Sequence, residues 1–351
     1  MRGASDHHQI DERNENILMA VIQSFISTAE PVGSRMLSKR YNFGLSPATI
    51  RNVMSDLEES GFLEQPHISA GRVPTDLGYR FYVNHLPGTQ ELSAEESALI
   101  TQRFAPFRGE VDEVMAEASR LLSEISSYAG IVLRKFSTTV FSRIEFVKVR
   151  GQQVLAIFVM ESGIVQNKLV VLDEELTQDE LHRVSNYLNQ EFSGQQLGTI
   201  RQNLLERMAE DKVKYDQLLQ QVMQVGQKIF DSRTETEDDI YLGGTTNIMD
   251  QPEFMANVDR MKELFKAFEQ KSRLISILDL CLGESGIHVI LGSETPYEDI
   301  QECSFVTHTY NYSDQTIGVL GVIGPKRMAY PRVMAIVDYT ANQISKILTE
   351  G

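Results

Sequence analysis

The clearest pattern of apolar and polar positions near the N-terminus is that of a helix. Six apolar residues recur between Ile17 and Ile26 at the spacing of one helical face, which predicts an amphipathic helix. The segment Glu30-Pro31-Val32-Gly33 interrupts that pattern. Ser34 then stands where it can cap a short second helix with its own apolar face. The first forty residues therefore predict two helices joined by a tight turn.

A third helix begins at Ser46-Pro47, where a serine N-cap precedes a proline at the first helical position. Its apolar positions, Ile50, Val53, Met54 and Leu57, share one face. Small and hydrogen-bonding side chains occupy the opposite face, namely Ala48, Arg51, Asn52 and Ser55. Such side chains near a helix N-terminus suit close approach to base edges in a DNA major groove.

A short hairpin follows the third helix. Residues 62–65 and 72–73 predict two brief strands, and residues 66–71 the turn between them. Three helices followed by such a hairpin describe a winged helix-turn-helix, in which the hairpin is the wing. Two interpretations without DNA binding stay open, because helix-turn-helix patterns also arise by chance and a basic residue on a helix is commonly only solvated.

Each candidate DNA-contacting residue has an expected role in this module. Arg51 and Asn52 are expected to read bases, while the basic residues of the second helix and those around the wing contact phosphates. The complete candidate set is Arg35, Lys39, Arg40, Ser46, Thr49, Arg51, Asn52, Ser55, Ser69, Arg72, Thr75, Tyr79 and Arg80.

The remainder of the chain predicts a mixed α+β region that carries an insertion. Helices are expected at residues 93–107 and 110–128, a capped helix from Thr177, and a final helix at residues 331–348. Strands are expected at residues 131–133, 141–149, 154–160, 164–171, 287–291, 305–312 and 316–323. Strands that stop, give way to a long helical block and then resume indicate one α+β domain with an insertion at residues 195–268.

The helical block contains an apolar seam with a spacing close to seven residues, broken only by Asp211. Its members are Leu204, Met208, Tyr215, Leu218, Val222, Val225 and Ile229. This spacing favours packing of one helix against another. The partner helix can lie in the same chain or in a second copy, and the pattern alone leaves both open.

Charge limits where nucleic acid can bind. The chain of 351 residues has a formal net charge of −16, yet residues 1–87 hold 8 Lys+Arg against 10 Asp+Glu. Phosphate binding needs clustered cations. Contact with DNA is therefore expected to be local, at a small basic set within an acidic molecule.

No catalytic or metal-binding pattern is apparent, so we expect neither an enzyme nor a cofactor. We expect Cys281 and Cys303 to be two buried thiols in a reducing compartment. The glycine-rich stretch at residues 318–326 lacks the spacing of a phosphate-binding loop. Structural or solvated roles are favoured for the remaining candidates, which are His182, His288, His308 and the acidic run at residues 235–239. The absence of a signal-like or membrane-spanning apolar segment predicts a cytoplasmic protein.

Several longer motifs resemble the HrcA family of heat-inducible transcription repressors. They are Pro31-Val32-Gly33-Ser34, residues 46–52, residues 57–62, the wing segment Ser69 to Arg80, Tyr241-Leu242-Gly243-Gly244 with Asn247, Pro252-Glu253-Phe254, and residues 321–328 with Tyr330. The resemblance covers nearly the whole chain except the polar extension before Asn14.

The resemblance implies a winged-helix domain at residues 1–88, a GAF-like α+β domain at residues 89–194 and 269–351, and an inserted dimerising domain at residues 195–268. It further implies a homodimer that binds an inverted-repeat operator in double-stranded DNA upstream of chaperone genes, with activity that depends on temperature and on the chaperonin GroEL. An alternative is a ligand-responsive repressor of another regulon, with the GAF-like domain as its sensor.

Overall fold

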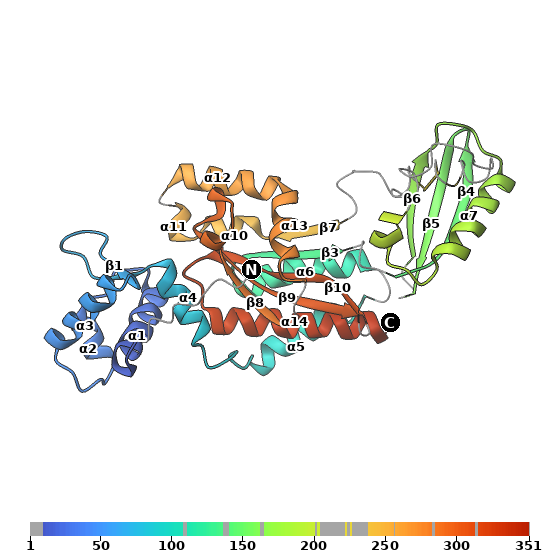
Figure 1. Cartoon of the computed structure of the whole chain (residues 1–351). Coiled ribbons are helices and arrows are strands. Elements are labelled where there is room, and N and C mark those ends of the chain that lie inside the picture. Colours follow the sequence, from blue (N-terminus) through green and yellow to red (C-terminus); the bar gives the residue numbers. More distant parts are fainter. Residues whose placement is uncertain are drawn as a thin grey trace.

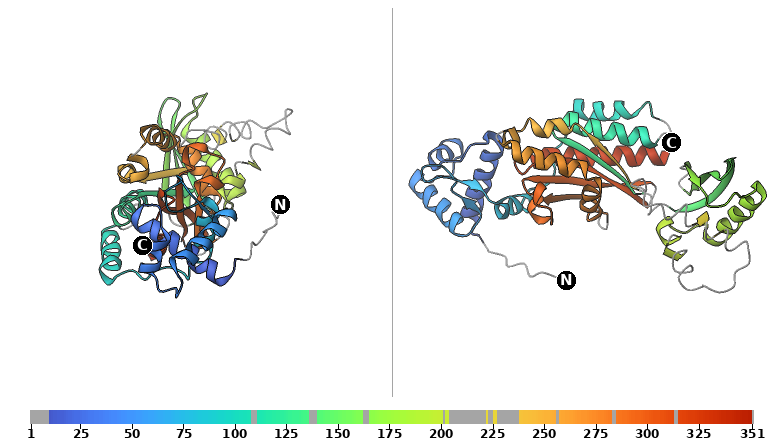
Figure 2. Two further views of the ribbon diagram at one scale, coloured as in Figure 1. Left: turned by 90° about the vertical axis from the view of Figure 1, so that its left-hand side faces the viewer. Right: turned by 90° about the horizontal axis from the view of Figure 1, so that it is seen from above.

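The computed structural model describes residues 10–107, 111–135, 140–161, 165–200, 202–203, 222, 225–226, 238–255, 257–282, 285–312 and 315–350. Three units follow one another in space: an N-terminal module, a central unit built on five strands, and a smaller unit built on three strands (Figure 1). The view from above shows the N-terminal module and the three-stranded unit at opposite ends (Figure 2). The mixed α+β class is confirmed.

The N-terminal module has the order of elements that the sequence predicts. Helices α1 (Glu12–Thr28), α2 (Ser34–Arg40) and α3 (Pro47–Glu59) precede the strands β1 (Leu63–Glu64) and β2 (Val73–Pro74), and α4 (Asp76–Asn84) completes the module. Ser46 caps α3, because its side chain accepts a hydrogen bond from the Thr49 amide. The predicted cap of α2 is wrong by one residue: Gly33 is the N-cap, and Ser34 is the first helical residue.

The central unit is an antiparallel sheet with the order β7-β3-β10-β9-β8. Its strands are β3 (Ala129–Lys135), β7 (Asp238–Gly243), β8 (Ile287–Leu291), β9 (Cys303–Tyr312) and β10 (Gln315–Pro325). Two short 3-10 helices, η1 (Gly292–Glu294) and η2 (Glu298–Ile300), lie between β8 and β9. The acidic run at residues 235–239, which the notion of a solvated segment led us to expect outside the sheet, partly joins it, because β7 begins at Asp238. Residues 235–237 lie outside the described part of the chain.

Helices cover both faces of the five-stranded sheet (Figure 1). Along β10, Leu320 and Val322 pack in one core cluster, whereas Val319 and Ile323 pack in another, as the twofold alternation of a strand requires. The first cluster includes residues of α5 (Ala94–Phe104), α6 (Val111–Ser126) and α14 (Tyr330–Glu350), and it is continuous with the core of the N-terminal module. The second includes residues of α10 (Thr245–Met249), α11 (Pro252–Met255), α12 (Val258–Glu269) and α13 (Lys271–Asp279).

The three-stranded unit has its own sheet and its own core. Strands β4 (Phe141–Arg150), β5 (Gln153–Met160) and β6 (Val165–Val171) pair antiparallel in that order. Helix α7 (Gln178–Phe192) begins with a capping box formed by Thr177 and Glu180. Its apolar face packs on one side of the sheet in a cluster separate from those of the central unit.

This strand pairing corrects the expected position of the insertion. We predicted that residues 141–194 would share a domain with the strands after residue 287 and that the insertion would begin at residue 195. Instead, β4, β5 and β6 form a sheet of their own, whereas β7 and α10 to α13 belong to the central unit. The insertion therefore begins after β3 and ends before β7. The strand pattern alone cannot assign a strand to one of two sheets.

Candidate nucleic-acid interface

Helix α3 presents its polar face to solvent. Ala48, Arg51 and Asn52 are exposed, whereas Ile50 and Val53 are buried in the core of the N-terminal module. Ser46 at the N-cap and Pro47 at the first helical position fix the start of the helix, so these three side chains project from its first turns. In the described part of the chain, no carboxylate forms an ion pair with Arg51. Its guanidinium is therefore available for an external acceptor.

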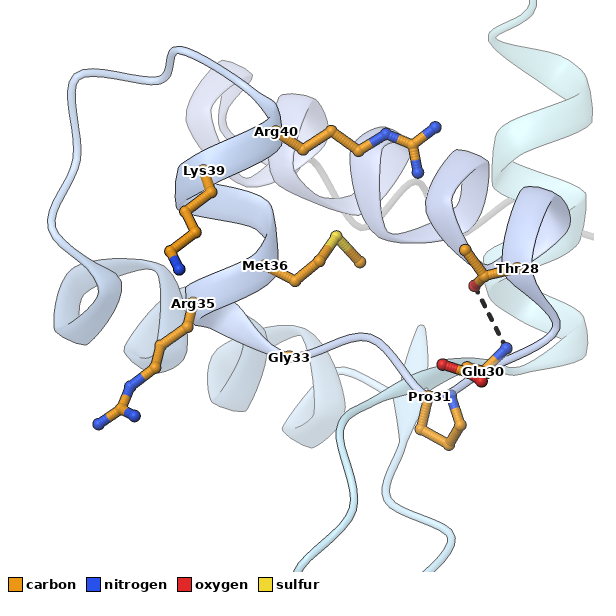
Figure 3. Close-up of a pocket in the computed structure, with 8 residues that line it drawn as sticks. All are labelled: Thr28, Glu30, Pro31, Gly33, Arg35, Met36, Lys39 and Arg40. Carbon is orange, nitrogen blue, oxygen red and sulfur yellow. Dashed lines mark hydrogen bonds between the residues drawn. The ribbon is translucent and has the colours of Figure 1, made fainter.

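Two cations of α2 are likewise exposed and free of ion pairs among the described residues, namely Arg35 and Lys39. They line an open pocket together with Thr28, Glu30, Pro31, Gly33, Met36 and Arg40. In Figure 3 the side chains of Arg35 and Lys39 point away from α1, whereas that of Arg40 reaches back over it. Arg40 donates to the Ser27 hydroxyl over 3.2 Å. Arg35 and Lys39 are thus the better placed pair for a phosphate.

The hairpin is fastened to the turn before α2. Val32 and Arg72 exchange two backbone hydrogen bonds of 2.9 Å each. A Cβ on Gly71 would lie 2.4 Å from the Val32 carbonyl oxygen, so only glycine allows this approach. Close packing against the Val32 backbone therefore requires glycine at this position of the wing motif.

Arg72 has a different position from the one expected. Its guanidinium forms an ion pair with Glu58 at 2.6 Å, and only 17% of its side chain is exposed. Glu58 belongs to α3, so the pair ties the base of the hairpin to the helix that carries Arg51 and Asn52. This geometry makes Arg72 a positioning residue, and it does not support a phosphate contact.

Three other predicted DNA contacts face the central unit or the backbone. Tyr79 is buried, with 4% exposed. Arg80 pairs with Glu294 and donates to the Val289 carbonyl oxygen. The Thr75 hydroxyl caps α4 and donates to the Gly61 carbonyl oxygen over 2.6 Å. Because these groups are already engaged, we remove Thr75, Tyr79 and Arg80 from the DNA-contacting set. Ser46, Ser55, Ser69 and Thr49 remain in the set. Ser46 and Ser69 are exposed, and Ser55 and Thr49 are partly exposed.

The residues that sequence reasoning missed form a joint between the N-terminal and central units. Lys326 pairs with Asp76 at 2.5 Å. Arg327 pairs with Glu253 at 2.5 Å and also donates to the Ile26 carbonyl oxygen at the end of α1. The sequence did contain a signal for this joint. Residues 321–328 and the segment ending at Arg80 both belong to the motifs that carry the family resemblance.

Two tyrosines lie within the same joint. The Tyr330 side chain is fully buried, and its hydroxyl donates to the Lys326 carbonyl oxygen over 2.7 Å. Burial raises the pKa of Tyr330 above its ordinary value, and burial together with the nearby Tyr330 raises the pKa of Tyr79. Both phenols therefore stay neutral at physiological pH, as a closely packed joint requires.

The predicted apolar seam falls mostly outside the described residues. Of its seven members, the structure describes only Val222 and Val225, which are both buried in the core cluster that also contains α7. Leu204, Met208, Tyr215, Leu218 and Ile229 lie outside the described part of the chain. Whether the seam packs within or between chains stays a prediction.

Other expected features can be located in the described residues. The prediction that Cys281 and Cys303 are buried thiols is confirmed. In the same residues, no group of three or more His, Cys, Asp and Glu side chains is arranged to hold a metal ion. No helix among these residues has the length and apolarity needed to cross a membrane.

Known proteins that are similar to this chain belong to the family that its sequence motifs resemble. A family model described as HrcA protein C terminal domain matches residues 112–334. The heat-inducible transcription repressor HrcA of Geobacter sulfurreducens is 47% identical over 340 residues, which cover 97% of this chain and 98% of the relative. The HrcA repressor of Syntrophobacter fumaroxidans is 41% identical over 343 residues, with 97% and 98% covered. A crystal structure described as that of a hypothetical protein superimposes with a TM-score of 0.60 at 20% identity, covering 97% of this chain and 99% of that chain, and it supports the fold alone.

Proposed function

The chain belongs to the HrcA family of heat-inducible transcription repressors, and from that premise we propose that it represses chaperone operons by binding an inverted-repeat operator as a homodimer. One observation carries this proposal. Arg51 and Asn52 on α3, and Arg35 and Lys39 on α2, are exposed on neighbouring helices of one module. An acidic chain thereby presents a local cationic and hydrogen-bonding surface to DNA.

In this proposal the N-terminal module is a winged helix-turn-helix. Helix α3 enters the major groove, where Arg51 donates to a guanine edge and Asn52 pairs with an adenine edge. Arg35 and Lys39 neutralise phosphates beside the groove. The central unit is the GAF-like domain implied by the resemblance. The protein acts in the cytoplasm as a regulator and not as an enzyme.

The homodimer is supported by an apolar face of the three-stranded sheet. Its outward residues include Val147, Val149, Val165, Leu169 and Val171, each 42–59% exposed. Val147, Leu155 and Leu169 lie directly opposite one another across the three strands, so the face is continuous. We propose that a second copy of this chain covers it, because a two-fold pair of reading modules is what an inverted repeat requires.

The proposed dimer is tested by a charge on that face. Leu169→Asp is expected to leave the chain monomeric in sedimentation experiments, since an unpaired charge would be buried between the two copies. Leu280→Asp is the matched control, because Leu280 is 67% exposed on the central unit. A Leu169→Asp variant that remains as dimeric as the wild type would contradict this interface.

The DNA-binding proposal is tested by gel shift with a chaperone-operon promoter fragment that contains an inverted repeat. Tighter binding to this fragment than to one with the repeat scrambled supports it. Equal binding to both at moderate salt would refute it, since the phosphate contribution is the same for every sequence.

Regulation is proposed to follow temperature and chaperonin supply. Heating loosens the fold or the dimer, and the chaperonin GroEL restores the active repressor. Operator binding after brief heating is expected to recover further with GroEL present than without it. Identical recovery in both samples would count against a role for the chaperonin.

A further inference from the structure

The tip of the hairpin exposes an apolar side chain completely. Ile68 is 100% exposed, whereas the next most exposed large apolar residue among those described, Leu280, is 67% exposed. Ile68 is flanked by His67 and Ser69, both also exposed. An isolated apolar side chain at the end of a projecting turn has no partner within the described chain, and burial against another surface would be favourable.

The turn that carries Ile68 is held in place by one side chain. The Nε2 group of Gln65 donates to the Ile68 carbonyl oxygen over 2.9 Å and to the Ala70 carbonyl oxygen over 3.0 Å. The Ala70 amide in turn donates to the His67 carbonyl oxygen over 2.8 Å. These bonds fix the backbone on both sides of Ile68, so its outward orientation is part of the folded structure.

The base of the hairpin is fixed relative to α3. Strands β1 and β2 pair through Leu63 with Pro74 and Glu64 with Val73. The ion pair between Arg72 and Glu58 adds a direct link from the hairpin to α3. The distance between the tip of the hairpin and the exposed face of α3 is therefore set by the fold.

The charge around the turn is compatible with a polyanion. No acidic residue occurs between Glu64 and Asp76, although the chain holds 49 Asp and Glu residues. The turn can therefore approach phosphates without local repulsion. Minor-groove binding proteins frequently insert an apolar side chain between base steps and so kink the duplex.

From these observations we propose that Ile68 is an apolar wedge that enters the DNA minor groove beside the major groove read by α3, and that Gln65 is its positioning residue. The proposal rests on the proposed DNA-binding function and extends it to a contact without hydrogen bonds. The wedge contributes to binding affinity because its apolar surface is removed from water, and it also bends the duplex. Each homodimer would place two such wedges symmetrically on the operator.

The test uses the full-length protein and a chaperone-operon promoter fragment with donor and acceptor dyes at its ends, so that energy transfer reports bending. Ile68→Ala is expected to weaken binding by at least about tenfold and to reduce bending. Its salt dependence should match the wild type, because no phosphate contact is lost. Ile68→Leu should retain most of the affinity. The control is Leu77→Ala, at a half-exposed apolar residue of α4.

If the Ile68→Ala variant bound and bent the fragment as the wild type does, the proposal that Ile68 is a wedge would be overturned. The proposed function fails separately, if the wild-type protein itself shows no preference for the fragment over its scrambled form. Gln65→Ala should weaken binding in the same way, and the double variant should be no weaker than Ile68→Ala alone. Fully additive losses would overturn the positioning role of Gln65.

Discussion

The ammonium group of Lys326 lies 2.5 Å from Oδ1 of Asp76. Asp76 opens α4 of the N-terminal module, and Lys326 stands in the loop between β10 and α14 of the central unit. The neighbouring Arg327 reaches the end of α1 and Glu253 of α11. The orientation of the DNA-binding surface is therefore set by contacts with the central unit.

We predict that breaking this joint weakens operator binding without touching the DNA-contacting residues. Asp76→Lys alone should reduce affinity about threefold to tenfold, because the two reading modules of a dimer are then no longer held in a fixed orientation. Adding Lys326→Asp should restore part of the affinity, since the pair is re-formed with its charges exchanged. Titration by fluorescence anisotropy measures both. A double variant no better than Asp76→Lys would argue against the pair as the cause.

A second prediction separates base reading from phosphate binding. Arg51→Ala is expected to cost about 1–3 kcal/mol on the operator and little on random DNA, because a bidentate contact to a base is lost. Lys39→Ala is the matched comparison on α2. It should weaken binding to both sequences alike and reduce the salt slope by about one. Equal losses for Arg51→Ala on both sequences would reassign Arg51 to a phosphate.

A third prediction concerns Gly71. Gly71→Ala should lower the melting temperature and operator affinity together, because its Cβ would lie 2.4 Å from a backbone oxygen that cannot move independently. Gly33→Ala is the comparison without a clash, since a Cβ there meets nothing within 4 Å, and it should cost only the weaker capping of α2 by alanine. Calorimetry should show a clearly larger decrease in melting temperature for the first variant than for the second. Similar melting temperatures for the two variants would contradict the close approach seen between Gly71 and Val32.

A fourth prediction follows from the buried tyrosines of the joint. Burial raises the pKa of Tyr330 in the folded chain above its ordinary value of about 10. The unfolded chain therefore releases this proton first, and stability that is complete below pH ~10 falls by about 1.4 kcal/mol per pH unit above it. Tyr330→Phe should lessen that slope in urea titrations between pH 8 and 11. An unchanged slope would show that Tyr330 does not control alkaline unfolding.

Local signals in the sequence predicted most of the fold. The cap at Ser46, the capping box at Thr177 and the strand at residues 287–291 are all confirmed, because each depends on neighbouring residues. The division of strands between two sheets was wrong, since pairing of β3 with β7 joins segments about a hundred residues apart.

The candidate site was predictable to a similar extent. The exposure of Arg51 and Asn52 followed from the period of α3. The engagement of Arg72 by Glu58 and of Arg80 by Glu294 did not follow from any local pattern, because both partners are defined only by the tertiary structure. The sequence motif therefore led us to predict that both arginines contact DNA. In the structure, each of them instead links two parts of the protein.

Binding of a homodimer to an inverted repeat is tested most directly by a hydroxyl-radical footprint of the purified full-length protein on a chaperone-operon promoter that contains such a repeat. Two symmetric protected half-sites are expected, with protection lost when either half of the repeat is scrambled or when Leu169→Asp separates the dimer. Uniform protection without regard to the repeat, or full protection by a monomer on a single half-site, would contradict this mode of binding.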